Sequence, residues 1–181
     1  MIHKAFKKGD AVSEALYSPC MGYRYALTRQ WDEKGPRVLF IMLNPSTATE
    51  EQNDPTIERC ERRARALGFG GFRAVNIFSW RETSPDKLRQ HSAPVGPEND
   101  LVLMESCTWA DQVVCGWGAH GEHQDRGRYV ANLLMSGGYA LHCLGTTKAG
   151  HPRHPLYIAY KTLPQNWIPD DRYLRHAGAD G

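Results

Sequence analysis

Polar residues, glycines and aromatic residues follow several apolar runs of this sequence. Asn44-Pro45-Ser46-Thr47 comes directly after the apolar run from Val38 to Leu43. The segments Asn76–Arg81, Gly116–Gly118 and Gly145–Tyr157 follow three later apolar runs. The amides, hydroxyls, imidazoles and indoles of these segments can orient a water molecule, donate a hydrogen bond or stack on a flat ring. Their chemistry therefore depends on whether the fold brings the four segments together.

The apolar runs are predicted strands, and helical patterns separate them. Apolar residues occupy both faces of the run 38–43, which is typical of a strand inside a parallel sheet. Asp54 is a good N-cap, Pro55 suits the first helical position and Gly68 follows the predicted end of that helix. We predict strands over residues 23–31, 38–43, 72–78, 111–118 and 140–145, helices over 55–67, 97–110 and 125–136, and a loop with a short helix within 79–89.

Strands that alternate with helices indicate a parallel sheet in an α/β sandwich. Ligands of such sheets bind where the carboxyl ends of the strands meet the loops, so we expect the four polar segments to converge on one edge. A length of 181 residues fits one domain. We assign that domain to residues 1–169 and expect residues 170–181 to form a frayed tail.

Net charge, apolar runs and cysteine content limit the classes of protein that this sequence fits. The net charge of +2 permits a nucleic-acid partner without indicating one. The first residues lack the apolar core of a signal peptide, and the longest apolar run is too short to span a membrane, so we expect a cytoplasmic protein without a membrane partner. The five cysteines are scattered without a CxxC pair, which indicates reduced thiols and no thiolate metal site. We expect no cofactor, and the oligomeric state stays open.

Two other groups of residues have plain interpretations. His120 and His123, and also His151 and His154, lie three residues apart, but in Gly- and Pro-rich loops and without an acidic residue at the offset of a hydrolytic zinc motif, so we expect no bound metal. The arginines within 59–65 lie mostly off the apolar stripe of the first predicted helix. We interpret them as a solvated helix face rather than a DNA-binding patch.

The motifs together resemble a known family. The pattern "MLNPSTAT…NDPT…RC…NIFSWR" followed by "GWG…CLG.TK.G.P.HPLY" is similar to the domain-of-unknown-function family numbered 1643. The layout also resembles the uracil-DNA glycosylase superfamily, with Leu43–Ser46 as its first motif and His154–Tyr157 as its second. Asn76–Leu88 is similar to a middle segment of the iron–sulfur branch. The sequence departs from the superfamily in lacking the glycine before the first motif and in having Leu156 where the second motif has serine.

The resemblance implies a fold and an activity. The fold would be a three-layer α/β/α sandwich with a small mainly parallel sheet, like that of uracil-DNA glycosylases. The activity would be excision of a damaged or modified base from DNA. Asn44 would then orient the attacking water, and His154 would donate to the leaving base. Asp54 could act as a base, although a helix N-cap is its simpler role.

Base excision also needs residues that hold the nucleotide. Asn76 or Asn99 could read the base edge, and Phe78, Trp80 or Trp117 could stack on its face. Leu156 and Tyr157 could fill the gap that a displaced base leaves, and Lys148, Arg153 and Arg81 could hold phosphates. Pro45 and Ser46 complete the first motif.

Two rival functions stay open at this stage. One is a non-catalytic module that uses the same pocket to bind a nucleotide or nucleic acid. Its mark would be a pocket in which Asn44 and His154 fail to share a water-accessible gap. The other is a hydrolase of free nucleosides or nucleotides, whose mark would be a closed pocket without a basic groove.

Overall fold

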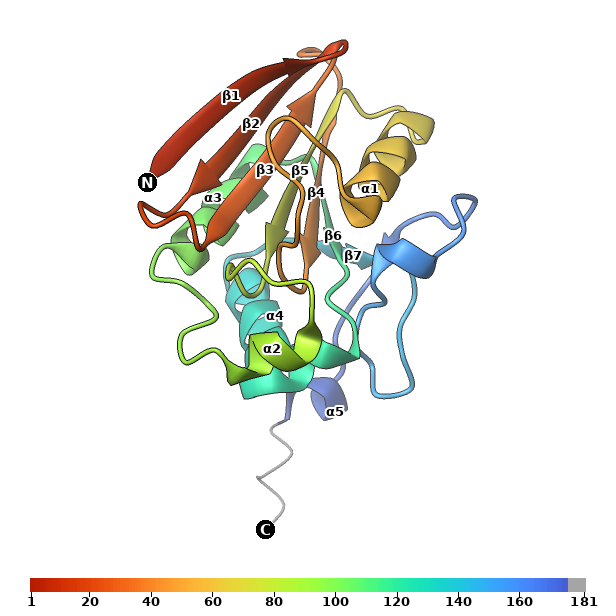
Figure 1. Cartoon of the computed structure of the whole chain (residues 1–181). Coiled ribbons are helices and arrows are strands. Elements are labelled where there is room, and N and C mark those ends of the chain that lie inside the picture. The colour runs from red at the N-terminus through yellow and green to blue at the C-terminus, as the bar shows by residue number, and fades with distance from the viewer. Residues whose placement is uncertain (176–181) are drawn as a thin grey trace.

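The computed structural model describes residues 1–175, whose eight strands form one sheet with helices on both faces (Figure 1). The strands are β1 (Ile2–Lys8), β2 (Ala11–Tyr17), β3 (Arg24–Gln30), β4 (Arg37–Met42), β5 (Gly71–Asn76), β6 (Gln112–Cys115), β7 (Leu141–Cys143) and β8 (Gln165–Asn166). The helices are α1 (Pro55–Ala66), α2 (Pro85–Gln90), α3 (Asn99–Trp109), α4 (Arg126–Ser136) and α5 (Asp171–Leu174). Two 3₁₀ segments, η1 (Ala119–Asp125) and η2 (Pro155–Tyr157), complete the described chain.

The sheet is mixed rather than mainly parallel, so that part of the expected fold is wrong. Its strand order is β1-β2-β3-β5-β4-β6-β7-β8. The central neighbours β5, β4, β6 and β7 pair in parallel, whereas the pairs β1–β2, β2–β3, β3–β5 and β7–β8 are antiparallel. The antiparallel pairs outnumber the parallel ones because β1 and β2 extend one edge of the sheet as a hairpin and β8 closes the other.

The alternation of helices with the four parallel strands is confirmed. In α1 the cap is the predicted one, since Asp54 Oδ1 accepts the Ile57 N–H at 2.9 Å and Pro55 begins the helix. Gly68 follows the helix with φ +82°, a backbone conformation that glycine adopts without strain. The short helix α2 lies in the predicted loop, and the ends of α3 and α4 lie within two residues of their predicted bounds.

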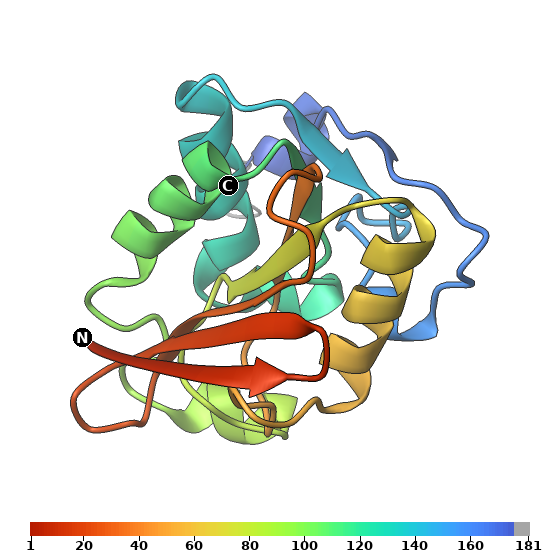
Figure 2. The ribbon, with the colours of Figure 1, turned by 90° about the horizontal axis from the view of Figure 1, so that it is seen from above.

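Two apolar cores lie on opposite faces of the sheet. One face of the sheet packs against α1, whose buried Ile57, Cys60 and Ala64 contact the apolar side chains of the central strands. The other face packs against α3 and α4. Seen from above, α1 lies on one side of the sheet and α3 and α4 lie on the other (Figure 2). The helices therefore leave the carboxyl ends of the parallel strands to the loops.

The arginines of α1 do not all lie on a solvated face, which corrects the sequence interpretation. Arg62 and Arg65 are surface residues paired with carboxylates. Arg63 is fully buried and donates to the carbonyls of Ile158, Ala159 and Thr162. Arg59 also donates to the carbonyl of Ile158. These two arginines hold the segment after η2 against the helix.

The C-terminal stretch is partly folded. Residues 171–174 form α5, and Tyr173 is buried. The rest of the predicted frayed tail, residues 176–181, lies outside the described residues. Within residues 1–175, none of the helices combines the length and the apolar character that crossing a membrane requires.

Candidate functional site

Segments from all four parallel strands meet around a cavity of about 540 Å³ at the carboxyl edge of the sheet. The four strand ends and the start of α1 contribute its lining, which consists of Leu43, Asn44, Ser46, Asp54, Pro55, Thr56, Glu82, Thr83, Pro85, Trp117, Gly118, Ala119, His120, His154, Leu156 and Tyr157. We call this space the edge cavity. The middle segment reaches it just beyond the predicted range, through Glu82 and Thr83 instead of Asn76–Arg81.

Asn44 has its side chain oriented by the neighbouring loop. Its Nδ2 donates to the carbonyls of Glu82 at 2.6 Å and Pro45 at 3.1 Å. A carbonyl oxygen could not replace Nδ2 against these acceptors, so the identity of the two amide atoms is fixed. Within residues 1–175, Asn44 Oδ1 accepts no hydrogen bond and is therefore available to a ligand or water in the edge cavity.

His154 is the N-cap of η2, in the loop that follows β7. Its Nδ1 accepts the N–H of Leu156 at 3.2 Å, so the proton of the neutral imidazole lies on Nε2. Burial lowers the pKa of His154 to about 4, against the opposing attraction of the Asp54 carboxylate. His154 is therefore neutral near pH 7 and presents one N–H donor.

Asp54 lines the edge cavity but is committed to the backbone. Oδ1 accepts the N–H of Ile57, and Oδ2 accepts the N–H of Ala48 at 3.2 Å. The two oxygens of Asp54 therefore hold both the cap of α1 and the end of the 44–48 loop. Each oxygen of Asp54 already accepts a backbone hydrogen bond, which is the geometry of a helix cap.

Trp117 forms a wall of the cavity. The side chain is 1% exposed, and its Nε1 donates to the Tyr173 hydroxyl at 3.0 Å. Gly118 has φ +70° and ψ −170°, a conformation close to glycine-only backbone. Its N–H donates to the carbonyl of Pro152 at 2.8 Å, which joins the end of β6 to the His154 loop.

Several candidate residues lie elsewhere. Asn99 is fully buried, accepts from the Ser79 hydroxyl, and donates to the carbonyls of Asn76 and Ile77, so it organises the end of β5. Phe78 is fully buried with its ring centroid 5.5 Å from that of His123, which leaves no free face for a base. Four more of the proposed binding residues, Pro45, Asn76, Lys148 and Arg153, are absent from the lining of the edge cavity. The expected contacts of Asn99 and Phe78 with a base do not fit this geometry, because neither side chain reaches the cavity surface.

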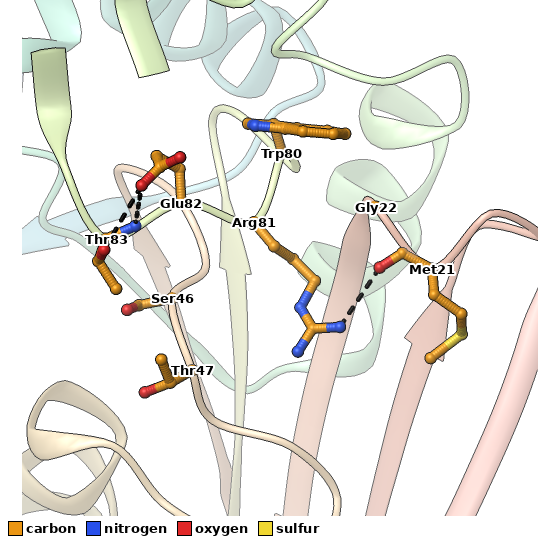
Figure 3. A pocket seen from close by; sticks show the side chains of 8 residues that line it. All are labelled: Met21, Gly22, Ser46, Thr47, Trp80, Arg81, Glu82 and Thr83. Carbon is orange, nitrogen blue, oxygen red and sulfur yellow. Dashed lines mark hydrogen bonds between the residues drawn. The ribbon is translucent and has the colours of Figure 1, made fainter. Parts of the chain in front are cut away.

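A second cavity of about 460 Å³ adjoins the first and shares Ser46, Glu82 and Thr83 with it. We call it the Arg81 cavity (Figure 3). Its other lining residues are Met21, Gly22, Thr47, Trp80 and Arg81. Arg81 therefore lies beside the edge cavity rather than in it. Trp80 stacks on His91 with ring centroids 3.8 Å apart, so one of its faces is already occupied.

Sequence reasoning missed Glu82, Thr83 and His120, which line the edge cavity. Glu82 and Thr83 directly follow a segment that was expected at the site, so extending that segment by two residues would have found them. Backbone N–H groups of Ser84 and Thr83 lower the pKa of Glu82 by binding its carboxylate. His120 bonds to Arg89 through Nδ1 at 2.8 Å, a contact between η1 and α2 that no local pattern indicates.

The histidines do not gather into a metal site. In the part of the chain that the structure describes, no three His, Cys, Asp or Glu side chains come together as a metal-binding group. His151 is buried beside Tyr173 and approaches Glu122, with Nε2 and Oε1 3.2 Å apart. His123 packs on Phe78 instead.

Comparison with known proteins identifies one family. A family model described as "Protein of unknown function (DUF1643)" matches residues 24–156. The match spans β3 to η2 and includes both Asn44 and His154. Neither the curated proteins nor the solved structures give a match. The expected resemblance to the domain-of-unknown-function family numbered 1643 is thereby confirmed. The resemblance to uracil-DNA glycosylases stays a prediction.

Proposed function

The chain belongs to the DUF1643 family, and we propose that this protein recognises a nucleobase and hydrolyses the bond that joins it to a sugar in DNA. The proposal takes up the resemblance of its two motifs to those of uracil-DNA glycosylases. One observation carries it: the edge cavity holds a free acceptor, Asn44 Oδ1, and a neutral donor, His154 Nε2–H. In hydrolysis of an N-glycosidic bond, an acceptor can orient the attacking water and a donor can stabilise the leaving base.

The reaction assigns one task to each group. A water that donates a hydrogen bond to Asn44 Oδ1 attacks the sugar carbon. The carbon–nitrogen bond breaks, and its electron pair leaves with the base. The His154 N–H stabilises the negative charge that develops on the base. The water becomes the sugar hydroxyl, its second proton passes to solvent, and the base takes a proton from solvent.

The neutrality of His154 supports this role. An imidazole with a pKa of about 4 gives a hydrogen bond to an anion at pH 7 without itself losing a proton. A protonated histidine in the same place would pay a large desolvation penalty in the buried site. Burial of His154 therefore favours stabilisation by hydrogen bonding over proton transfer.

A second candidate function is binding of a nucleotide without bond cleavage. The observation that favours it is the commitment of both Asp54 oxygens to backbone N–H groups. Asp54 is then not free to receive a proton from the attacking water, and Oε1 of Glu82, the other carboxylate of the lining, accepts the N–H groups of Thr83 and Ser84. Asn44 cannot take up that proton, because an amide is not a base near neutral pH.

A base-release assay distinguishes the two functions. Duplex and single-stranded oligonucleotides that carry uracil, hypoxanthine or hydroxymethyluracil are incubated with the protein, and alkali reveals abasic sites. The variants are Asn44→Ala and His154→Gln, with His3→Gln on β1 as the matched control. Circular dichroism establishes that each variant is folded.

Hydrolysis would be supported if wild type and His3→Gln produce strand breaks and both Asn44→Ala and His154→Gln do not. Binding without breaks, weakened by the same two variants, would establish the second function. Neither breaks nor binding on any substrate would contradict both.

A further inference from the structure

Three arginines around the loop 46–53 form no salt bridge within the described chain. They are Arg24 and Arg29 on β3 and Arg81 after β5. Most other arginines of this protein pair with a carboxylate or lie on the surface. An unpaired guanidinium in a buried place is costly, because it has lost water without gaining a counter-charge.

Arg24 and Arg29 are buried, and their guanidinium N–H groups donate to backbone carbonyls of the loop 46–53. Arg24 Nη1 donates to the carbonyl of Ala48 at 2.6 Å, and Arg29 Nη2 donates to the carbonyl of Thr49 at 2.7 Å. Arg24 Nε is buried and has no partner among residues 1–175. Burial lowers the pKa of Arg24 to about 10, against the attraction of the Asp54 carboxylate, and weaker repulsion from Arg81 and Arg29 lowers it further. These carbonyls order the loop but do not neutralise the positive charge.

Arg81 places a positively charged guanidinium in the wall of the Arg81 cavity. It is half-buried, and its guanidinium makes one hydrogen bond, from Nη1 to the carbonyl of Met21 at 3.3 Å (Figure 3). The planar group lies 5.4 Å from the centre of the Tyr17 ring, which restricts its orientation. The remaining N–H groups of the guanidinium have no protein acceptor in the part of the chain that the structure describes.

Two hydroxyl groups and one carboxylate complete the polar lining of the Arg81 cavity. The hydroxyls of Ser46 and Thr47 form no hydrogen bond within residues 1–175 and are available to a ligand. Glu82 carries the opposing charge, but its Oε1 accepts the N–H groups of Thr83 at 2.9 Å and Ser84 at 3.1 Å. That carboxylate is therefore held by a turn, while the arginine has no counter-ion.

We propose that the Arg81 cavity binds a phosphate group of the ligand whose base enters the edge cavity. The base part of this statement rests on the proposed function, whereas the phosphate part does not. An arginine fork with nearby hydroxyls is suited to a phosphate, and a phosphate supplies the missing negative charge. The two cavities share Ser46, Glu82 and Thr83, so one nucleotide can occupy both. The substrate is then a nucleotide or a strand rather than a free base or nucleoside.

Equilibrium binding tests the proposal with Trp80 as the reporter, because its indole ring lines the same cavity. Inorganic phosphate, the four common deoxynucleosides, their 5′-monophosphates and a single-stranded hexanucleotide are titrated while the indole N–H signals are followed by NMR. The variants are Arg81→Gln, Arg81→Lys and the control Arg62→Gln, which removes the same charge from the exposed face of α1. Thermal unfolding verifies that the variants are folded.

The expected result is a shift of the Trp80 signal with inorganic phosphate and tighter binding of nucleotides than of nucleosides. Arg81→Gln should weaken nucleotide binding about ten- to a hundredfold, the usual worth of a hydrogen bond to a charged group, and leave nucleoside binding unchanged. Arg81→Lys should restore part of the affinity, and Arg62→Gln should have no effect. A preference for the hexanucleotide over the monophosphate would assign the phosphate to a strand, and equal affinity would assign it to a free nucleotide.

Two outcomes would overturn the proposal. One is that nucleosides bind as tightly as nucleotides, and the other is that Arg81→Gln weakens binding no more than Arg62→Gln. Failure of the proposed function has a different signature. Phosphate and nucleotides would still bind through Arg81, but Asn44→Ala and His154→Gln would leave their affinity unchanged.

Discussion

Replacing Arg63 by alanine should destabilise the protein far more than replacing its neighbour Arg62. Arg63 is fully buried, and its guanidinium donates to the carbonyls of Thr162 at 2.7 Å, Ile158 at 2.9 Å and Ala159 at 3.1 Å. Arg62 lies on the exposed face of α1 and pairs with Glu58 at 2.8 Å. The two variants remove the same side chain from adjacent positions, so helix propensity and net charge cancel in the comparison.

The magnitude follows from the bonds lost. A hydrogen bond to a charged group contributes about 1.5–3 kcal/mol when its partner is removed. Water can replace the arginine at Ala159 and Thr162, which lie near the surface, and Arg59 still donates to Ile158. Truncation also relieves the buried, unpartnered Nε of Arg63. The net loss should therefore be about 2–4 kcal/mol, against about 0.3–0.5 kcal/mol for the exposed pair of Arg62.

Urea unfolding of the two variants measures the difference. Comparable slopes with a much lower midpoint for Arg63→Ala would agree with the reasoning. A second readout follows from the chain, because the segment that Arg63 holds begins just after His154 and η2. Loosening that segment should raise the pKa of His154 from about 4 toward that of a free imidazole in an NMR titration. Equal and small losses of stability in the two variants would refute the role assigned to Arg63.

Three further predictions concern the edge cavity. The folded pKa of His154, about 4, lies below that of a free imidazole, so the unfolded chain protonates first as the pH falls. The stability that this group contributes is complete above about pH 6.5 and declines by up to about 3 kcal/mol toward pH 4, and His154→Gln should flatten that part of a pH series of urea unfolding curves. Asn44→Asp should destabilise the protein by about 1–3 kcal/mol, because a carboxylate would face the carbonyl of Glu82, and a thermal melt that matches wild type would contradict this. Gly118→Ala should cost about 1–3 kcal/mol because its φ of +70° and ψ of −170° are nearly confined to glycine, whereas Gly138→Ala, just past the end of α4 at φ +81° with open space around it, measures the strain of a positive φ alone and should cost less in the same melts.

Local signals predicted the elements that carry the site. Asp54 and Pro55 begin α1, and Gly68 follows its end, because caps act within one helical turn. The apolar run 38–43 predicted β4 because a central parallel strand buries both faces. The meeting of the strand ends then follows from topology alone, which is why Asn44 and His154 were expected near one another.

Long-range contacts could not be predicted in the same way. The strand β1 was not predicted, because nearly every residue in it is exposed and no alternation of apolar and polar residues marks it. Arg63 resembles its solvated neighbours in the sequence, and only carbonyls more than ninety residues away make its burial possible. Asn99 is a polar residue near a helix start, yet its side-chain amide donates to the backbone carbonyls at the end of β5. These outcomes depend on which distant backbone groups need partners.

The central claim is that Asn44 and His154 present one acceptor and one donor to a nucleobase, and a ligand titration tests it most directly. Uracil, cytosine, adenine and hypoxanthine are added in turn to the labelled protein, and the His154 Nε2 and Asn44 side-chain amide signals are followed by NMR. We predict that at least one base shifts both signals together, that exposed His3 stays unchanged, and that His154→Gln weakens that binding about tenfold, as the loss of one buried hydrogen bond implies. Shifts confined to other residues, or binding that ignores the His154→Gln change, would contradict the account.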